Sequence, residues 1–189
     1  MMSDEKQLIE DLKNNNSQAF HKLVNLYHEK IHAISYGFLR NKEDAEDITQ
    51  EVFIEIHKNI HFFREESNLS TWIHRITINR SLNLIKKNKI KNLFDSFEQL
   101  ILFNRNEPNS ESDPHQQLTQ KEIAKQVQNA LNKLPKNQNI AFTLHKYNNL
   151  SYAQIADIMN TSLSSVESLI HRAKNNLKIS LKELNKNKP

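Results

Sequence analysis

The chain has 189 residues with a formal net charge of +4, one glycine, four prolines and no cysteine, and its sequence pI is about 9.2. This composition indicates a mainly helical protein of one or two small domains, and it excludes disulfide scaffolds and cysteine-ligated metal sites. Neither end resembles a signal peptide and no apolar run approaches the length of a membrane span, so we expect a cytoplasmic protein without membrane insertion.

Apolar residues recur every three or four positions along most of the chain, which is the spacing of amphipathic helices. The expected helices cover residues 17–38, 42–60, 70–91, 119–133, 136–147, 151–159 and 164–182. Residues 104–120 lack this periodicity and contain two prolines, which is typical of a linker. We therefore predict an all-α fold in which two small helical domains, residues 1–91 and 121–189, are joined by a flexible linker at residues 92–120.

Charged residues are segregated in the first half of the chain. Residues 43–57 contain six acids and no Lys or Arg, whereas residues 67–94 contain six Lys or Arg residues and no acid. An ordinary solvated helix carries mixed pairs four residues apart, which would not give two neighbouring runs of opposite sign. The segregation favours a polyanionic partner for the basic segment.

The last two expected helices carry a helix-turn-helix pattern. Ser151 and Gln154 fit a capping box, Leu150 and Ile155 fit the accompanying hydrophobic staple, and Asn160 in the short turn tolerates a left-handed conformation. The second helix of such a motif enters the DNA major groove with its N-terminal residues against base edges. An ordinary helical hairpin in a bundle is the structural alternative.

Glu167 is the one acid on the polar face at the start of that second helix. Ser164 lies three residues before it, so the pair fits another capping box, and we prefer this interpretation because it needs no partner. The alternative is a carboxylate that accepts a hydrogen bond from cytosine N4 in the groove.

One motif points to different chemistry. Residues 28–32, HEKIH, match the H-E-x-x-H pattern in which His28 and His32 would bind zinc and Glu29 would act as general base. Nine histidines make chance matches common, and no companion motif supplies a third ligand. We therefore expect no metal site and keep a zinc hydrolase only as a remote alternative.

Three stretches together resemble extracytoplasmic-function (ECF) sigma factors of the sigma-70 family. They are DAEDITQEVFIEIHKNI, FREESNLSTWIHRITINRSLNLIKK and LPKNQNIAFTLHKYNNLSYAQIADIMNTSLSSVESLIHRAKNNL. Helix-turn-helix segments are common, whereas the D-x-x-Q-E-x-F helix followed by F-R-x-x-S-x-L-x-T-W-I-x-R-I is highly specific. The resemblance implies an RNA polymerase sigma factor that directs promoter recognition, −10 melting and transcription initiation, without covalent chemistry and without a cofactor.

By this resemblance, the acidic helix docks on the clamp helices of the largest subunit of core RNA polymerase, and the C-terminal domain contacts the flap region. The implied core-binding residues are Asp44, Asp47, Gln50, Glu51, Ile54 and Glu55. At about 100° per residue the four acids share one face of a helix, and Ala45, Ile48 and Val52 form the neighbouring inward stripe.

The basic helix and the loop before it would recognise and melt the −10 promoter element, and the loop from His61 to Ser70 would hold a flipped non-template base. The implied −10 residues are Phe63, Arg64, Ser67, Asn68, Leu69, Ser70, Thr71, Trp72, Arg75, Asn79, Arg80, Asn83, Lys86 and Lys87. Trp72 fits a core position as well as it fits a base-stacking platform.

The recognition helix would meet the −35 element. The implied −35 residues are Ser164, Ser165, Glu167, Ser168, His171, Arg172, Lys174 and Asn175. Family recognition helices commonly carry basic residues in place of Glu167 and Leu169, and the turn often has Gly in place of Asn160. Base contacts at these departures therefore do not follow from the resemblance.

Promoter DNA, core polymerase and an anti-sigma factor are the partners that the resemblance implies. The alternative function is a helix-turn-helix regulator that binds duplex DNA without polymerase. Core-dependent transcription distinguishes the two, because a simple regulator does not open promoter DNA.

Overall fold

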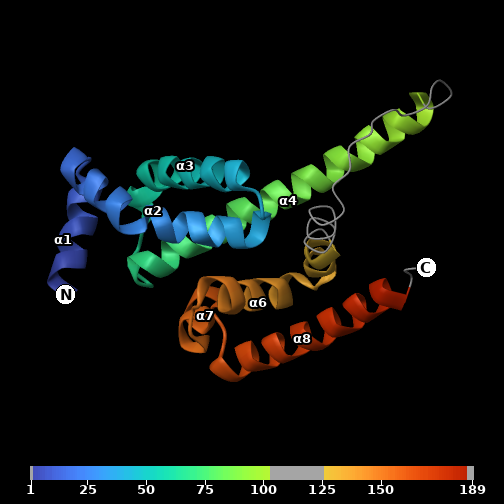
Figure 1. Cartoon of the computed structure of the whole chain (residues 1–189). Coiled ribbons are helices and arrows are strands. Elements are labelled where there is room, and N and C mark those ends of the chain that lie inside the picture. The colour runs from blue at the N-terminus through green and yellow to red at the C-terminus, as the bar shows by residue number, and fades with distance from the viewer. Residues whose placement is uncertain (1, 103–125, 187–189) are drawn as a thin grey trace.

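A computed structural model describes residues 2–102 and 126–186. Its helices, shown in Figure 1, are α1 (Met2–Lys13), α2 (Ser17–Leu39), α3 (Lys42–Asn59), the 3-10 turn η1 (Ile60–Phe62), α4 (Leu69–Leu102), α6 (Lys136–Asn148), α7 (Tyr152–Met159) and α8 (Leu163–Lys186). Residues 126–133 are also helical. These ranges contain helices and turns but no strand, which confirms the all-α prediction. Within them, no helix combines the length and the apolar content that crossing a membrane requires.

The first domain, α1 to α4, surrounds one apolar core. Leu23 and Ile31 of α2, Val52 and Ile56 of α3 and Ile73 of α4 are fully buried in it. Helix α2 packs against both α3 and α4. The periodic apolar residues of the three predicted helices are therefore the residues that hold the domain together.

Helix α1 is absent from the predicted helices. Leu8 and Leu12 bury their side chains in the same core, and Glu5 accepts a hydrogen bond from the backbone N–H of Leu69 at 2.8 Å. Acids in its first turn and Lys13 in its last turn suit the helix dipole. Through the Glu5 contact, α1 supports the start of α4.

Helix α4 extends further than predicted. It runs to Leu102 instead of ending near Lys91, so the first part of the predicted linker, residues 92–102, is helical. The rest of that linker lies outside the described residues. Within α4, His74 is only 8% exposed, and burial, with a smaller contribution from Lys30, lowers its pKa to about 4.

The second domain contains the helix-turn-helix. Leu144 of α6, Ile155 of α7 and Val166 of α8 are fully buried together, and a smaller cluster that includes Leu131 and Leu177 continues along α8. Helix α7, the turn at residues 160–162 and α8 have the predicted order, which confirms the motif.

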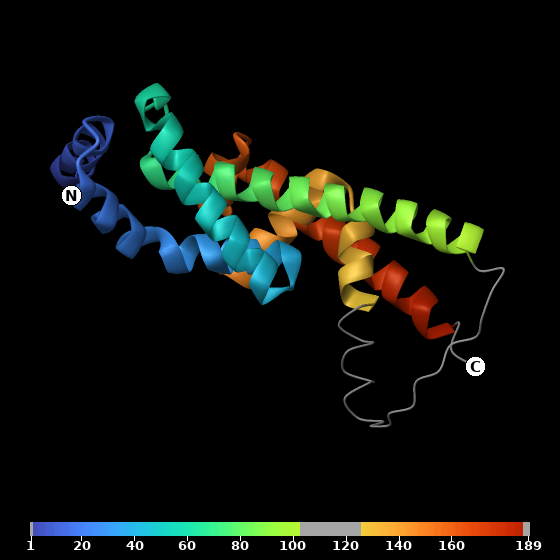
Figure 2. The same ribbon diagram turned by 90° about the horizontal axis from the view of Figure 1, so that it is seen from above.

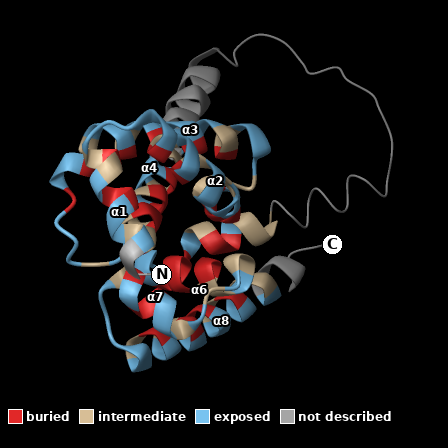
Figure 3. Cartoon of the chain, turned by 90° about the vertical axis from the view of Figure 1, so that its left-hand side faces the viewer, coloured by how far each residue is buried: buried red, intermediate tan, exposed pale blue. Residues whose placement is uncertain are grey.

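The two domains are packed against each other. Helix α2 contacts α6 and α4 contacts α7, and Figure 2 shows α4 passing across the helices of the second domain. Ile34, Phe38 and Ile78 of the first domain belong to the same buried cluster as Ile140 and Leu144 of the second. Figure 3 shows buried residues on both sides of this contact.

Candidate nucleic-acid interface

The acidic face of α3 has the predicted geometry. Ala45, Ile48 and Val52 are buried, whereas the six predicted core-binding residues are exposed or half-buried. Ile54 is 54% exposed beside the acid row. Asn41 caps the helix by accepting a hydrogen bond from the Asp44 backbone N–H at 2.8 Å. The result is an exposed apolar side chain next to a row of acids on an accessible helix surface.

Arg80 connects this acidic face to the basic helix. Its Nε donates to Glu55 Oε2, and its Nη1 lies 3.6 Å from Glu51 Oε2. A predicted DNA contact on α4 is thus paired with two predicted polymerase contacts on α3. The side chains of Arg80, Glu51 and Glu55 are 44%, 53% and 25% exposed, so water screens their charges. A bound partner can therefore take the place of Arg80 or of the two glutamates.

Further along α4, the predicted DNA-binding side chains divide into two groups. Asn79, Asn83, Lys86 and Lys87 are exposed and available to a ligand. Arg75 is half-buried, and its guanidinium donates to the backbone carbonyls of Ile158 at 2.9 Å and Asp157 at 2.8 Å. These carbonyls lie in the last turn of α7, where the helix dipole favours a cation. Arg75 is therefore bound to the helix-turn-helix domain.

The loop before α4 corrects part of the −10 prediction. Phe63, Leu69 and Thr71 are at most 5% exposed, so their side chains are core residues and do not face a ligand. Trp72 is half-buried with its ring centroid 5.1 Å from that of Phe63, which favours its core role. Phe63 and Leu69, which flank the loop, pack into the apolar core of the first domain.

Two further residues of this segment have unexpected positions. Asn68 is exposed, but its side chain accepts a hydrogen bond from the Thr71 backbone N–H at 2.8 Å and so caps α4. Phe62, absent from the predicted site, is 78% exposed. Helical periodicity cannot distinguish Phe62 from Phe63 in the sequence, because the regular helix has ended: Phe62 closes a 3-10 turn and Phe63 follows it with an extended backbone. Arg64 is exposed and Ser67 and Ser70 are half-buried, so these three remain accessible.

The start of the helix-turn-helix is as predicted. Ser151 Oγ accepts from the Gln154 backbone N–H at 3.3 Å, and Gln154 Oε1 accepts from the Ser151 backbone N–H at 2.9 Å. This confirms the capping box. Asn160 ends α7 with φ 50° and ψ 55°, which confirms the left-handed turn residue.

The predicted cap of α8 is wrong. Ser162, not Ser164, caps the helix, because its Oγ accepts from the Ser165 backbone N–H at 3.2 Å. Glu167 then lies beyond the capping position, is exposed, and makes no hydrogen bond or ion pair with any residue in the described ranges. Helix α8 begins at Leu163, one residue earlier than the pattern predicted, and Glu167 is exposed on its surface.

The other predicted −35 residues form a polar surface on α8. Ser164, Ser168, His171, Arg172, Lys174 and Asn175 are exposed, and Ser165 is half-buried. The Arg172 guanidinium donates through Nε to the Ser168 carbonyl at 3.2 Å, which directs it along the helix. Buried Val166, Ile170 and Ala173 anchor the opposite face.

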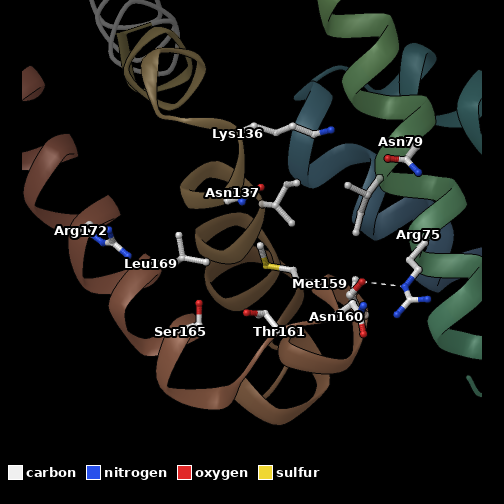
Figure 4. A pocket seen from close by; sticks show the side chains of 13 residues that line it. Arg75, Asn79, Lys136, Asn137, Met159, Asn160, Thr161, Ser165, Leu169 and Arg172 are labelled. Atoms are coloured by element: carbon white, nitrogen blue, oxygen red, sulfur yellow. Dashed lines mark hydrogen bonds between the residues drawn. The ribbon is translucent and has the colours of Figure 1, made fainter.

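A groove of about 700 Å³ separates the predicted −10 helix from the predicted −35 helix. Figure 4 shows Arg75 on one side, Leu169 and Arg172 on the other, and Thr161 of the turn between them. Lys136, at the start of α6, also lines the groove and was not predicted. The lining residues include three cations and no acid, so the groove is electropositive.

The histidine motif does not have zinc-site geometry. The rings of His28 and His32 are stacked nearly parallel with centroids 6.5 Å apart. His28 Nδ1 lies 3.6 Å from Glu29 Oε1, and His28 Nε2 lies 3.6 Å from Glu46 Oε1. Within residues 2–102 and 126–186, no group of three or more His, Cys, Asp or Glu side chains gathers as metal ligands would. These positions form an aromatic stack along α2 instead.

Comparisons with known proteins match both halves of the chain. Residues 23–90 match the family described as Sigma-70 region 2, and residues 124–177 match Sigma-70, region 4. The ECF RNA polymerase sigma factor SigW of Bacillus subtilis is 30% identical over 183 residues, covering 95% of this chain and 97% of SigW. The RNA polymerase sigma-H factor of Pseudomonas aeruginosa is 30% identical over 173 residues, covering 90% of each.

Two solved structures share the fold. CnrH in complex with the cytosolic domain of CnrY matches with a TM-score of 0.64 and 20% identity, covering 95% of this chain and 97% of CnrH. RpoE of Bartonella quintana, in complex with the anti-sigma factor NepR, matches with a TM-score of 0.54 and 23% identity, covering 86% of this chain and 96% of RpoE.

Proposed function

The chain belongs to the ECF branch of the sigma-70 family and is a sigma factor that works with RNA polymerase, and from this premise we propose how its surfaces divide the work. The first domain binds core polymerase through α3 and the −10 element through α4. The second domain binds the −35 element through α8. The chain acts as an initiation factor in the cytoplasm, where its polymerase is, and not as a catalyst.

The acidic face of α3 supports the polymerase assignment. Exposed Ile54 offers an apolar anchor, and the adjacent acids, including exposed Asp47, favour a basic partner surface. Charge complementarity of this kind steers association and fixes register, while the apolar centre contributes to affinity. Acids on this face also repel DNA, which leaves α4 as the DNA-binding helix.

The exposed residues of α4 and its preceding loop support the −10 assignment. Lys86 and Lys87 suit phosphates, and the amides of Asn79 and Asn83 can hydrogen-bond to base edges. Phe62 adds an accessible aromatic ring next to the loop, on which an unstacked base can rest. The buried residues Phe63 and Leu69 hold this surface in place.

On α8, Arg172 and Lys174 contact phosphates or the groove, since both are exposed on the face opposite the core. Glu167 has no capping role, so the remaining interpretation of this acid is a hydrogen bond accepted from cytosine N4. The flap region of polymerase remains the proposed second contact of this domain.

An anti-sigma factor is a further proposed partner, on family grounds. RpoE of Bartonella quintana is held by the anti-sigma factor NepR, and CnrH by the cytosolic domain of CnrY. Both share the fold of this chain, which makes a protein inhibitor a reasonable partner to seek by co-purification.

The observation that carries the proposal is the pairing of an accessible acidic helix with an accessible basic helix in one domain, followed by a helix-turn-helix. The test is reconstitution of the chain with core polymerase on genomic fragments and mapping of transcript starts. We expect starts that require both core and this chain. DNA binding without any chain-dependent start would favour the regulator that acts without polymerase.

A further inference from the structure

Helix α1 contacts the loop before α4 at both of its ends. This loop, residues 64–68, is the proposed holder of the flipped −10 base. Near its start, Lys13 Nζ lies 3.2 Å from Glu65 Oε1. Directly after its end, Glu5 Oε1 accepts a hydrogen bond at 2.8 Å from the backbone N–H of Leu69, the first residue of α4. The region 2 match covers residues 23–90, so both α1 side chains lie outside it.

The Glu5 contact is placed where a carboxylate is favourable. The first backbone N–H groups of a helix have no partner inside the helix, and the helix dipole favours a negative charge beside them. Asn68 accepts from one of these groups, the Thr71 N–H, at 2.8 Å, and Glu5 accepts from another, the Leu69 N–H. Because Glu5 is half-buried, water competes less for this hydrogen bond than for a contact on the open surface.

The Lys13 contact holds a residue with an unfavourable backbone conformation. Glu65 has φ 59°, which lies in the left-handed region that residues other than glycine seldom occupy. Such a conformation persists where surrounding contacts hold it. The side chains of Lys13 and Glu65 are 31% and 44% exposed, so water screens their ion pair. We therefore expect Glu5 to contribute more than Lys13 to the order of the loop.

The body of the loop is not packed tightly on α1. A cleft of about 230 Å³ lies between them, with Glu5, Ile9 and Ser67 among its lining residues. Helix α1 itself is fixed to the domain, because Leu8 and Leu12 are buried in the first core. The loop is therefore held near its ends by polar contacts to a fixed helix rather than by close packing along its length.

We propose that Glu5 is a positioning residue for the proposed −10 site, because through the Leu69 N–H it fixes the first turn of α4 and holds the loop in the geometry that receives an unstacked base. Lys13 assists it near the other end of the loop. This inference rests on the proposed function, because the loop is a proposed promoter contact. A loop that is competent in only a fraction of the molecules reduces the apparent affinity by that fraction.

The first test measures the Glu5 contact in the free full-length chain by amide hydrogen exchange. Glu5→Ala removes the acceptor, whereas Glu5→Gln keeps a carbonyl oxygen that can still accept from Leu69. Glu10→Ala is the matched control, because Glu10 is exposed on the same helix. We expect the Leu69 amide to exchange about tenfold faster in Glu5→Ala and near the wild-type rate in the other two variants. The amide of buried Val52 in α3 reports global unfolding, and its exchange should change far less.

The second test uses reconstituted holoenzyme on one promoter, supplied as a duplex and as a template already unpaired at −10. Glu5→Ala should reduce transcription from the duplex about tenfold, which is the loss expected when the loop is competent one time in ten instead of nearly always. The loss should be smaller on the unpaired template, where the opening step that needs the captured base has already taken place. Glu5→Gln should restore transcription from the duplex, and Lys13→Ala should reduce it only about twofold.

The two tests separate failure of this inference from failure of the proposed function. An unchanged Leu69 exchange rate in Glu5→Ala would show that Glu5 does not hold the start of α4. Faster exchange with unchanged duplex transcription, or with equal losses on both templates, would make the contact structural only and overturn the positioning role. A wild-type chain that supports no transcript start would instead contradict the proposed function, and the positioning role with it.

Discussion

Ser162 and Glu167 allow the cap of α8 to be separated from its DNA surface. Ser162 Oγ accepts from the Ser165 backbone N–H at 3.2 Å, so Ser162→Ala removes the bond that satisfies one of the free N–H groups of the helix. Loss of such a cap costs about 1 kcal/mol, which for a chain of this length corresponds to a melting temperature lower by roughly 2–4 °C. Glu167 lies beyond the first turn, so Glu167→Ala should change stability by less than about 0.5 kcal/mol.

The assay is thermal and urea unfolding of the full chain, with Thr161→Ala as the matched control, because Thr161 is exposed in the same turn and only its backbone is hydrogen-bonded among the described residues. In reconstituted transcription on −35 variants, Glu167→Ala should instead relax the preference at one base pair, by about 1–3 kcal/mol. If Glu167→Ala destabilised the protein as much as Ser162→Ala and left the preference unchanged, the acid would be the cap and this reasoning would be wrong.

Three further predictions follow from burial and charge. Phe63→Ala should destabilise the fold by about 3–5 kcal/mol, because Phe63 is buried. Phe62→Ala should leave stability unchanged and reduce transcription from duplex promoters more than from pre-melted ones. Equal effects on both templates would exclude a role of Phe62 in melting. Asp47→Lys combined with Ile54→Ala should weaken binding to core polymerase about tenfold, or 1.4 kcal/mol, with unchanged helicity, and an unchanged affinity would remove α3 from the interface. The pKa of His74 is about 4 in the fold against 6.5 unfolded, so the unfolded chain takes up the proton first and stability falls as pH drops from about 6.5 towards 4. The free energy of unfolding of His74→Leu, measured with urea, should therefore fall by about 2 kcal/mol less than that of wild type between pH 7 and pH 5. Equal pH dependence in the two proteins would contradict the burial of a neutral imidazole.

Local chemistry made much of the fold predictable. The capping box at Ser151 and the left-handed Asn160 depend only on neighbouring residues, and both were found where the pattern placed them. The cap of α8 was misplaced because Ser162 and Ser164 both precede an apolar run, and backbone geometry decides between them. Helix α1 was missed because its apolar face is short and gains stability by packing on a distant core.

Other features depend on contacts that local patterns do not encode. Three features depend on contacts between residues that are distant in sequence. They are the burial of Phe63 beside exposed Phe62, the pairing of Arg80 with α3, and the packing of the two domains against each other. The charge segregation predicted an acidic helix followed by a basic helix, and the structure has helices α3 and α4 at these positions. Which side chains on those helices are free was decided only by tertiary packing.

The Arg80 pairing makes the two surfaces of the first domain energetically dependent on each other. Glu51 and Glu55 lie on the proposed polymerase face, and Arg80 lies on the proposed DNA face. A partner that engages the acids releases the guanidinium, and a phosphate that engages the guanidinium releases the acids. By thermodynamic linkage, each event favours the other by the same free energy. A substitution made at Glu51 or Glu55 to study polymerase binding will therefore also change the affinity for DNA, and the two effects must be measured together.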